Sequence, residues 1–255
     1  DAAKKYGVIT QMGNQGHSGG GLESTIECIK SGVIGTVREV HVWTDRAQNW
    51  WPQGERVSLP KVKAEAPAHI DWNAFLGVAP EMPYSSNIHP FKWRGYLDFG
   101  CGAIGDMACH NMDPAFMALD LDQPSYVKTA CSEFNKVSFP AWSIVEWGFP
   151  AKGDRPAVKV FWYDGGKKPE RPADMPADMK LGGNGCLFIG DKGKMLGGSH
   201  AGFCQPFDKD YERPKRTLPR SEGHYKEWVM ACKGEKINRG TTGTKFGYAG
   251  PMTAT

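Results

Sequence analysis

The chain has 255 residues, a length that suits one large domain or two small ones. Charged residues make up 23% and hydrophobic residues 40%, a balance typical of a globular protein and not of a disordered one. The net charge of +3 comes with no dense basic run, because prolines interrupt the most basic stretch, residues 213–220. We therefore expect no nucleic-acid partner. We also expect no membrane partner, since no apolar stretch approaches the roughly 20 residues that span a bilayer.

The seven cysteines are scattered and contain no C-x-x-C pair, which argues against a disulfide framework and a zinc site. Cys101, Cys109 and His110 lie close in sequence, but such residues beside glycines are more often buried small side chains. We predict no metal site.

The first predicted elements are a helix end, a strand and a loop. Residues 1–7 resemble the last turn of a helix stopped by a glycine, and residues 8–12 have the β-branched character of a short strand. The polar loop 13–18 follows, where α/β proteins bind ligands. Apolar residues three and four apart then predict a helix over 22–30.

The middle of the chain adds one strand and two helices. Alternating apolar and polar residues predict a half-buried strand over 37–43. A short helix is expected over 71–77, between an acidic N-cap and a glycine. Another helix begins near 103–105, and Pro114 ends or kinks it. Trp43, Trp50 and Trp51 either form a stacking wall for a substrate or pack in the core or in a dimer interface.

Strands predominate in the second half. They are predicted over 126–131, 142–149, 158–163, 186–189 and 194–196, with a tight hairpin at 191–193, and helices over 224–233 and 246–255. We therefore predict an α+β fold with a large, mostly antiparallel open β-sheet and flanking helices. The proline-rich segment 167–180 is expected to be a surface lid or insertion.

Asp106 and His110 carry the chemistry of the central helix. Four residues apart, they lie on one helix face. A carboxylate beside a histidine raises its basicity, which suits removal of a hydroxyl proton, although such pairs are often only structural. The preceding loop offers Trp93 as an aromatic face and Arg94 as a cationic fork, unless Arg94 merely pairs with Asp98.

Gly100, Gly102 and Gly105 match G-x-G-x-x-G, the pattern of a dinucleotide fingerprint. We reject that interpretation, because no hydrophobic strand precedes the glycines and the following helix runs into a proline. The loop is better suited to binding the reacting group.

Residues 100–113 (GCGAIGDMACHNMD) resemble the G-G-G-x-L-x-D-x-x-x-H-x-x-D segment of the Gfo/Idh/MocA oxidoreductases. Residues 3–17 resemble the stretch after the E-K-P motif of that family, residues 31–37 its S-G-x-I-G-x-V segment, and residues 190–193 its G-x-x-G hairpin. Cys101 and Ala108 depart from glycines of the pattern, and both are small.

The resemblance implies two domains and an active site. Residues 1–17 would be a short remnant of a Rossmann α/β domain, and residues 18–255 a substrate-binding and oligomerisation domain. The glycine fingerprint, the ribose-binding acid and the E-K-P lysine of the family are absent. Because residues 1–7 resemble the end of a helix and residues 246–255 the start of one, we expect a chain truncated at both ends. His110 would be the catalytic base and Asp106 would stabilise its imidazolium.

The implied reaction is hydride transfer between a sugar or cyclitol carbon and the nicotinamide of NAD or NADP. Substrate-binding candidates are Trp93, Arg94, Asp98, Asn14 and His17, and cofactor-binding candidates are Gln15 and Gly102. The expected partners are a small-molecule carbohydrate and further copies of the chain, joined through the open sheet. Two alternatives stay open, an NAD-dependent glycoside hydrolase and a non-catalytic carbohydrate-binding or oligomerisation module. The sequence does not identify the sugar, choose between NAD and NADP or settle the compartment, for which we favour the cytoplasm over export.

Overall fold

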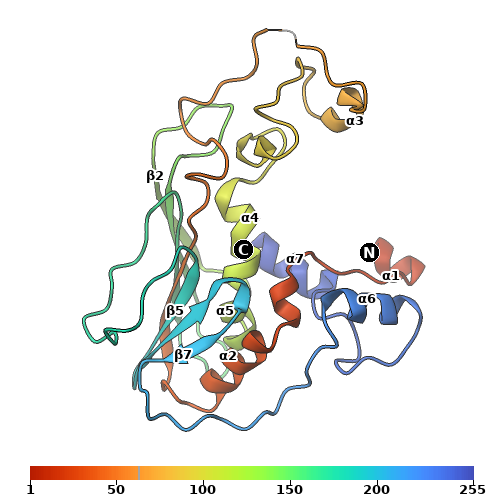
Figure 1. Cartoon of the computed structure of the whole chain (residues 1–255). Helices are drawn as coiled ribbons and strands as arrows, with labels where there is room; N and C mark the ends of the chain where they lie inside the picture. The colour runs from red at the N-terminus through yellow and green to blue at the C-terminus, as the bar shows by residue number, and fades with distance from the viewer. Residues whose placement is uncertain (63) are drawn as a thin grey trace.

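The computed structural model describes residues 1–62 and 64–255 and is built on one seven-stranded sheet with the order β2-β3-β4-β1-β5-β6-β7 (Figure 1). The strands are β1 (Val37–Trp43), β2 (Tyr126–Cys131), β3 (Ser143–Phe149), β4 (Val158–Tyr163), β5 (Gly185–Gly190), β6 (Lys194–Gly198) and β7 (Cys204–Pro206). The β1–β4 pair is parallel, whereas the remaining neighbours in the sheet pair antiparallel. The predicted large, mostly antiparallel sheet is confirmed.

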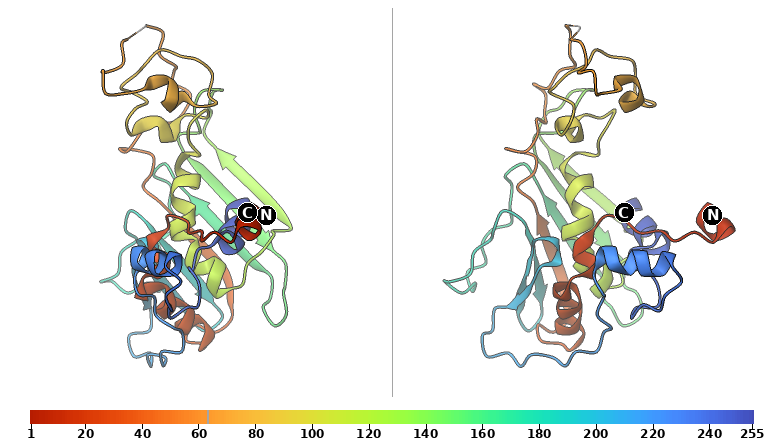
Figure 2. Two further views of the ribbon diagram at one scale, coloured as in Figure 1. Left: turned by 90° about the vertical axis from the view of Figure 1, so that its right-hand side faces the viewer. Right: turned by 45° about the vertical axis from the view of Figure 1, so that its right-hand side comes forward.

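Helices gather on one face of this sheet (Figure 2). The α-helices are α1 (Ala2–Tyr6), α2 (Gly20–Lys30), α3 (Trp72–Leu76), α4 (Gly102–Asn111), α5 (Asp113–Ala118), α6 (His224–Cys232) and α7 (Phe246–Ala254). The short 3₁₀ helices are η1 (Gln15–Ser18), η2 (Lys92–Gly95) and η3 (Ser199–Ala201). The main core lies between the sheet and α2, α4, α5 and α7, where Val40, Trp162 and Phe188 pack with Met107 and Phe116.

Local patterns explain most of these elements. In β1, Val40 and Val42 face the core while His41 lies on the opposite face, as period-two alternation requires. Leu22 and Ile26, one turn apart on α2, are buried together. At α3, the Asp71 carboxylate accepts a hydrogen bond of 2.9 Å from the backbone N–H of Ala74, which caps the helix.

The proline-rich segment at 167–180 lies over part of the other sheet face. Its Met175 and Met179 are buried against Trp43, Leu187 and Leu196, which form a second apolar cluster. The segment is therefore a packed strap, and Trp43 is a core residue, as the packing alternative for that tryptophan expects.

The structure corrects two local expectations and adds one strand. Residues 8–12 form no strand in the described chain; they run extended beside residues 242–244, with the Met12 N–H donating to Thr244 O at 3.0 Å. No neighbouring strand there supplies a full ladder of hydrogen bonds. The helix that begins at Gly102 ends at Asn111, and Pro114 lies in the first turn of α5, where its missing N–H is not needed. Strand β7 was not predicted, because three residues are too short for alternation to be recognised.

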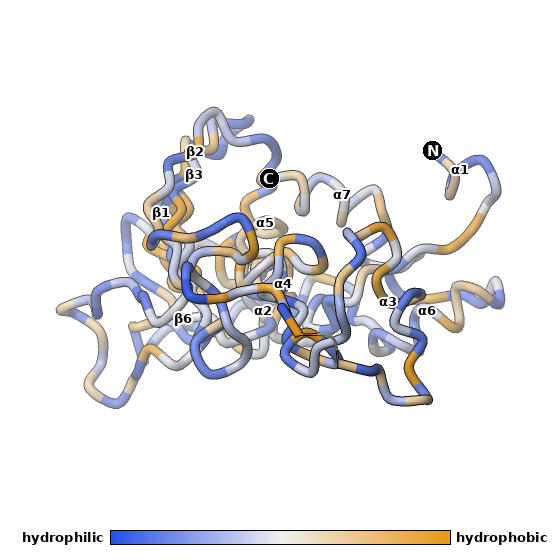
Figure 3. The backbone as a smooth tube through the Cα atoms, turned by 90° about the horizontal axis from the view of Figure 1, so that it is seen from above, coloured by the Kyte–Doolittle hydropathy of each residue, from blue (hydrophilic) through white to orange (hydrophobic). Residues whose placement is uncertain are grey.

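The apolar side of α6 is exposed to solvent. Trp228, Val229 and Cys232 are exposed, whereas His224 and Glu227 form the buried side. Tyr6, Val8, Ile9 and Tyr225 are exposed as well, together with Phe246 at the start of α7. Helix α1 projects from the body (Figure 2), and the segment after it is hydrophobic (Figure 3). In the described residues no helix is long and apolar enough to cross a membrane.

Candidate functional site

Helix α4 carries the two predicted catalytic side chains, and the loop before it determines how the helix begins. Gly102 has a φ of +63°, and a Cβ at this position would lie 2.8 Å from the ring of Phe139. A Cβ at Gly100 would lie 2.3 Å from the backbone O of Arg94. The glycines therefore let residues 93–101 fold back closely onto the start of α4.

This fold brings Arg94 to Asp106. The Arg94 Nε donates to Asp106 Oδ1 at 3.2 Å, and its Nη1 donates to the backbone O of Phe91 at 3.0 Å. The guanidinium carbon lies 4.6 Å from the ring centroid of Trp93 and 4.4 Å from that of Phe91, within cation–π range. Trp93, Arg94 and Asp106 thus form one cluster. Asp98 is exposed and makes no ion pair in the part of the chain described.

His110 stands one turn from Asp106 but interacts with a different residue. Its ring centroid lies 4.4 Å from that of His200, and its buried Nδ1 has no hydrogen-bond partner among the described residues. Burial lowers the pKa of His110, and so do His200 and Arg46, while Asp106 and Asp113 oppose them. His110 is therefore neutral at pH 7, the state that a general base requires.

His200 was not predicted as a site residue. It lies in η3, where its backbone N–H donates to Asn111 Oδ1 at 3.0 Å and its Nδ1 lies 2.6 Å from Ser199 Oγ. Gly16 lies against it so closely that a Cβ there would come within 1.9 Å of the backbone O of His200. Burial and Arg46 lower the pKa of His200 as well. The only sequence feature that points to His200 is its position beside glycines, just after a strand of a hairpin.

Asn14 and His17 lie in a buried network around Asp113, a residue of the family-like motif that we had not proposed for the site. The Asp113 carboxyl group is 2.8 Å from His17 Nδ1 and 3.2 Å from Asn14 Nδ2, and it accepts a hydrogen bond from Tyr248 OH. Burial and the neighbouring Asp113 raise the pKa of Tyr248, so its hydroxyl stays protonated and donates. The network joins loop 14–17 and α7 to the α4–α5 junction, beside His110.

The remaining candidates lie at the periphery. Gln15 is exposed, and its Nε2 donates to Tyr225 OH on α6 at 3.2 Å. Trp51 is buried with Ala47 and Ala103, whereas Trp50 is exposed under the guanidinium of Arg46, which lies 3.4 Å from its ring centroid. In residues 1–62 and 64–255 no group of three or more metal-binding side chains is arranged to hold an ion.

The Asp113 network should contribute measurably to stability. We expect Tyr248→Phe to keep the ring contacts with His17 and Phe116 but to remove one of the hydrogen-bond donors of the buried Asp113 carboxyl group. The expected loss in the free energy of unfolding is about 1–3 kcal/mol, measured by urea denaturation. The exposed Tyr225→Phe is the matched control and should change it by less than about 0.5 kcal/mol; equal effects of both substitutions would contradict the network.

The charges around His110 predict shifts of opposite sign. Removing His200 by His200→Ala should raise the pKa of His110, because a group that lowers it is gone. Asp106→Asn should lower the same pKa further, because it removes a negative charge. NMR titration of the His110 ring measures both shifts, with Asp98→Asn as the exposed control. Shifts of the same sign in the two variants would rule out this electrostatic account.

Comparison with known proteins completes the description of the site. The model of a protein family described as an oxidoreductase family, C-terminal alpha/beta domain, matches residues 21–151, which include β1, α4 and β3. A search of curated proteins gave no match.

Three solved structures share the fold of this chain. An oxidoreductase from Thermotoga maritima has 9% identity and a TM-score of 0.52, over 96% of this chain and 57% of that one. The WlbA dehydrogenase from Bordetella pertussis in complex with NADH and UDP-GlcNAcA has 12% identity and a TM-score of 0.56, over 99% of this chain and 61% of that one. An NAD-binding protein from Listeria innocua has 11% identity and a TM-score of 0.56, over 100% of this chain and 64% of that one. The chain thus spans less than two thirds of each neighbour.

Proposed function

We propose, because this chain belongs to the Gfo/Idh/MocA oxidoreductase family, that it supplies the substrate-binding side of an NAD(P)-dependent dehydrogenase acting on a sugar or cyclitol hydroxyl. The observation that carries the proposal is His110, a neutral base whose buried Nδ1 has no partner in the described chain, next to the Arg94–Asp106 ion pair. The Bordetella neighbour, bound to NADH and a nucleotide sugar, supports this substrate class.

A dinucleotide site needs glycines whose backbone approaches the pyrophosphate. In this chain, Gly102 is covered by Phe139 and a Cβ at Gly105 would lie 2.1 Å from that of Cys101, so these glycines serve packing. The glycines of residues 100–105 therefore do not fit the pyrophosphate, and the cofactor contacts of Gln15 and Gly102 stay predictions. We place the dinucleotide on a domain outside residues 18–255, docked on the exposed apolar surface of α6 and residues 6–9.

Each side chain then has a defined task. The bound nicotinamide would exchange a hydride with the substrate carbon. His110 would take the proton of the substrate hydroxyl, which its low pKa permits near neutral pH. Arg94, held by Asp106 and stacked on Trp93, would orient the sugar from one side. Asn14 and His17 would position α4 through Asp113.

The base is tested by substitution in a protein that joins this chain to a nucleotide-binding domain. We expect His110→Ala to lower kcat by about 10²–10⁴-fold with unchanged affinity for NADH. In the unsubstituted protein, kcat/KM should fall as the pH falls through the lowered pKa of His110, below 6.5, because protonation removes the base. The exposed His69→Ala is the control. Unchanged turnover of the His110 variant would eliminate this role, and glycoside cleavage without net NADH would identify the hydrolase instead.

We also propose that the open part of the sheet joins copies of the chain. On β2 all six residues are exposed. Further into the sheet, His41 on β1 stacks on Phe161 of β4 at a centroid distance of 5.0 Å and contacts Tyr163. Tyr126 donates to Glu146 on the same face. Such a mixture of aromatic and polar groups is typical of interfaces.

We expect the chain to sediment as an oligomer in analytical ultracentrifugation. Ala130→Arg, which places a bulky charge on the open face of β2, should yield monomers. The exposed Lys30→Ala on α2, away from this face, should not. A monomeric unsubstituted chain would refute the interface.

A further inference from the structure

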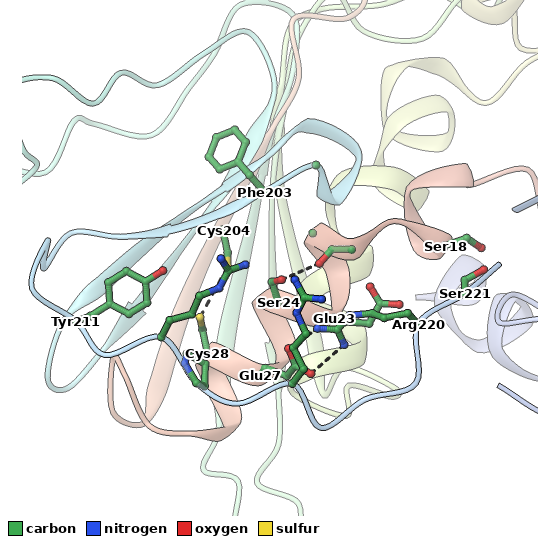
Figure 4. Close-up of a pocket in the computed structure, with 16 residues that line it drawn as sticks. Ser18, Glu23, Ser24, Glu27, Cys28, Phe203, Cys204, Tyr211, Arg220 and Ser221 are labelled. Carbon is green, nitrogen blue, oxygen red and sulfur yellow. Dashed lines mark hydrogen bonds and ion pairs between the residues drawn. The ribbon is translucent and has the colours of Figure 1, made fainter. Parts of the chain in front are cut away.

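Two of the seven cysteines lie against each other, and neither belongs to the candidate site. Cys28 on α2 and Cys204 on β7 are 176 residues apart in sequence, and their Sγ atoms are 3.8 Å apart. Figure 4 shows both side chains at one end of a cavity between α2 and the segment that follows β7. Cys101, Cys131 and Cys232 are exposed, and in the described chain no other cysteine pair is within hydrogen-bonding distance.

The two thiols have different environments. Cys28 is buried, with 2% exposure, and its thiol shares a hydrogen bond with the sulfur of Cys204. This hydrogen bond and burial raise the pKa of Cys28, whereas the same hydrogen bond lowers the pKa of Cys204, aided by Thr25 and the positive charge of Arg213. Cys204 is half-buried, and its lowered pKa makes it the more readily deprotonated of the two thiols. The thiolate is the reactive form of cysteine. Cys28 has the placement of a resolving thiol.

The cavity gives a reagent access to Cys204. Its volume is about 500 Å³, and its lining includes both cysteines and three arginines, Arg213, Arg216 and Arg220. Arg220 is paired with Glu27. Arg213 and Arg216 form no salt bridge in the part of the chain that the structure describes. The lining acids are both occupied, since Glu23 pairs with Arg239. The cavity therefore has surplus positive charge next to a reactive sulfur and favours an anionic reagent.

We propose that Cys28 and Cys204 form a redox-active dithiol that an anionic small-molecule disulfide, of the glutathione type, oxidises through this cavity. The Cys204 thiolate attacks one sulfur of the glutathione disulfide, forms a mixed disulfide and releases one glutathione thiolate, which takes a proton from water. Cys28 then loses its proton to solvent and attacks the Cys204 sulfur, which releases the second glutathione. Two electrons pass from the cysteine pair to the glutathione disulfide.

The closing step requires only a small movement. A disulfide has an S–S distance of about 2.05 Å, so the sulfurs must approach by less than about 2 Å. Strand β7 can move toward α2, because it is a three-residue strand at the edge of the sheet. The bond would tie α2 to the edge of the sheet across a long loop of chain, which restricts the unfolded state.

The first experiment incubates the reduced chain with oxidised glutathione, alkylates the remaining thiols and maps the peptides by mass spectrometry. We expect a Cys28–Cys204 disulfide, the loss of two of the seven thiols, and a higher Tm that dithiothreitol reverses. The proposal would be overturned if Cys28 and Cys204 were found alkylated, and therefore not oxidised, while glutathione had reacted with the exposed Cys131 and Cys232. So would a linkage of Cys204 to Cys186.

Substitutions separate the two sulfurs. Cys28→Ser should accumulate a stable mixed disulfide between glutathione and Cys204, whereas Cys204→Ser should give no adduct at Cys28. The reverse pattern would show that Cys28, and not Cys204, makes the first attack. Because the mapping of the unsubstituted chain needs no variant, a variant that fails to fold does not weaken the test.

The charge of the cavity is tested at its rim. Arg216→Gln should slow oxidation by glutathione disulfide several-fold and leave the rate with the neutral hydroxyethyl disulfide unchanged. The control is Arg38→Gln on β1, an exposed arginine outside the cavity lining. If the unsubstituted chain and the Arg216→Gln variant react with glutathione disulfide at equal rates, the cavity has no role in selecting the reagent.

Discussion

The buried Asp113 carboxyl group is the constraint on which the arrangement around the site depends. A carboxyl group removed from water needs hydrogen-bond donors, and this one obtains them from Asn14, His17 and Tyr248. These donors come from opposite ends of the chain. Satisfying one buried group therefore brings loop 14–17 and α7 together at the junction of α4 and α5. Helix α4, which carries Asp106 and His110, is held in place as a consequence.

The two proposed catalytic side chains on α4 are controlled by different neighbours. Asp106 bonds Arg94, twelve residues earlier, because a guanidinium and a carboxylate form a charge-assisted hydrogen bond. His110 instead lies beside His200 in a half-buried position, which lowers its pKa. The spacing of Asp106 and His110 predicts a direct pair. In the structure Asp106 bonds Arg94 instead, which we propose to face the substrate, and the surroundings of His110 lower its pKa.

The short segment between β6 and β7 connects the two proposed activities. It carries His200 next to His110 and ends at Cys204, which contacts Cys28. Two glycines on the other side allow the close contact: a Cβ at Gly16 would meet the backbone of His200, and one at Gly21 would lie 2.0 Å from the backbone O of Ala201. A disulfide at Cys204 would thus restrain the backbone that positions His200, so the redox state of the pair and the environment of His110 share one structural element.

The sequence by itself determined the elements whose signals are local. Strands β1, β2 and β4 have the predicted bounds. For β1, the alternation along a half-buried strand is a property of adjacent residues. Helix α3 follows from its cap for the same reason. The family-like motif located Asp106 and His110 on one helix.

Only the tertiary structure decided how distant segments meet. The partner of Asp106, the place of His200 beside His110 and the contact of Cys28 with Cys204 each join residues whose separation in the chain carries no periodic signal. The same holds for residues 8–12, which have strand-like composition but lie beside residues 242–244 without a sheet. The polar side of α6 is likewise buried through a distant contact. Its Glu227 carboxylate accepts hydrogen bonds from the hydroxyl of Ser221 and the backbone N–H of Gly243. Such contacts are set by packing and by the need to satisfy buried polar groups, and local residue patterns do not encode them.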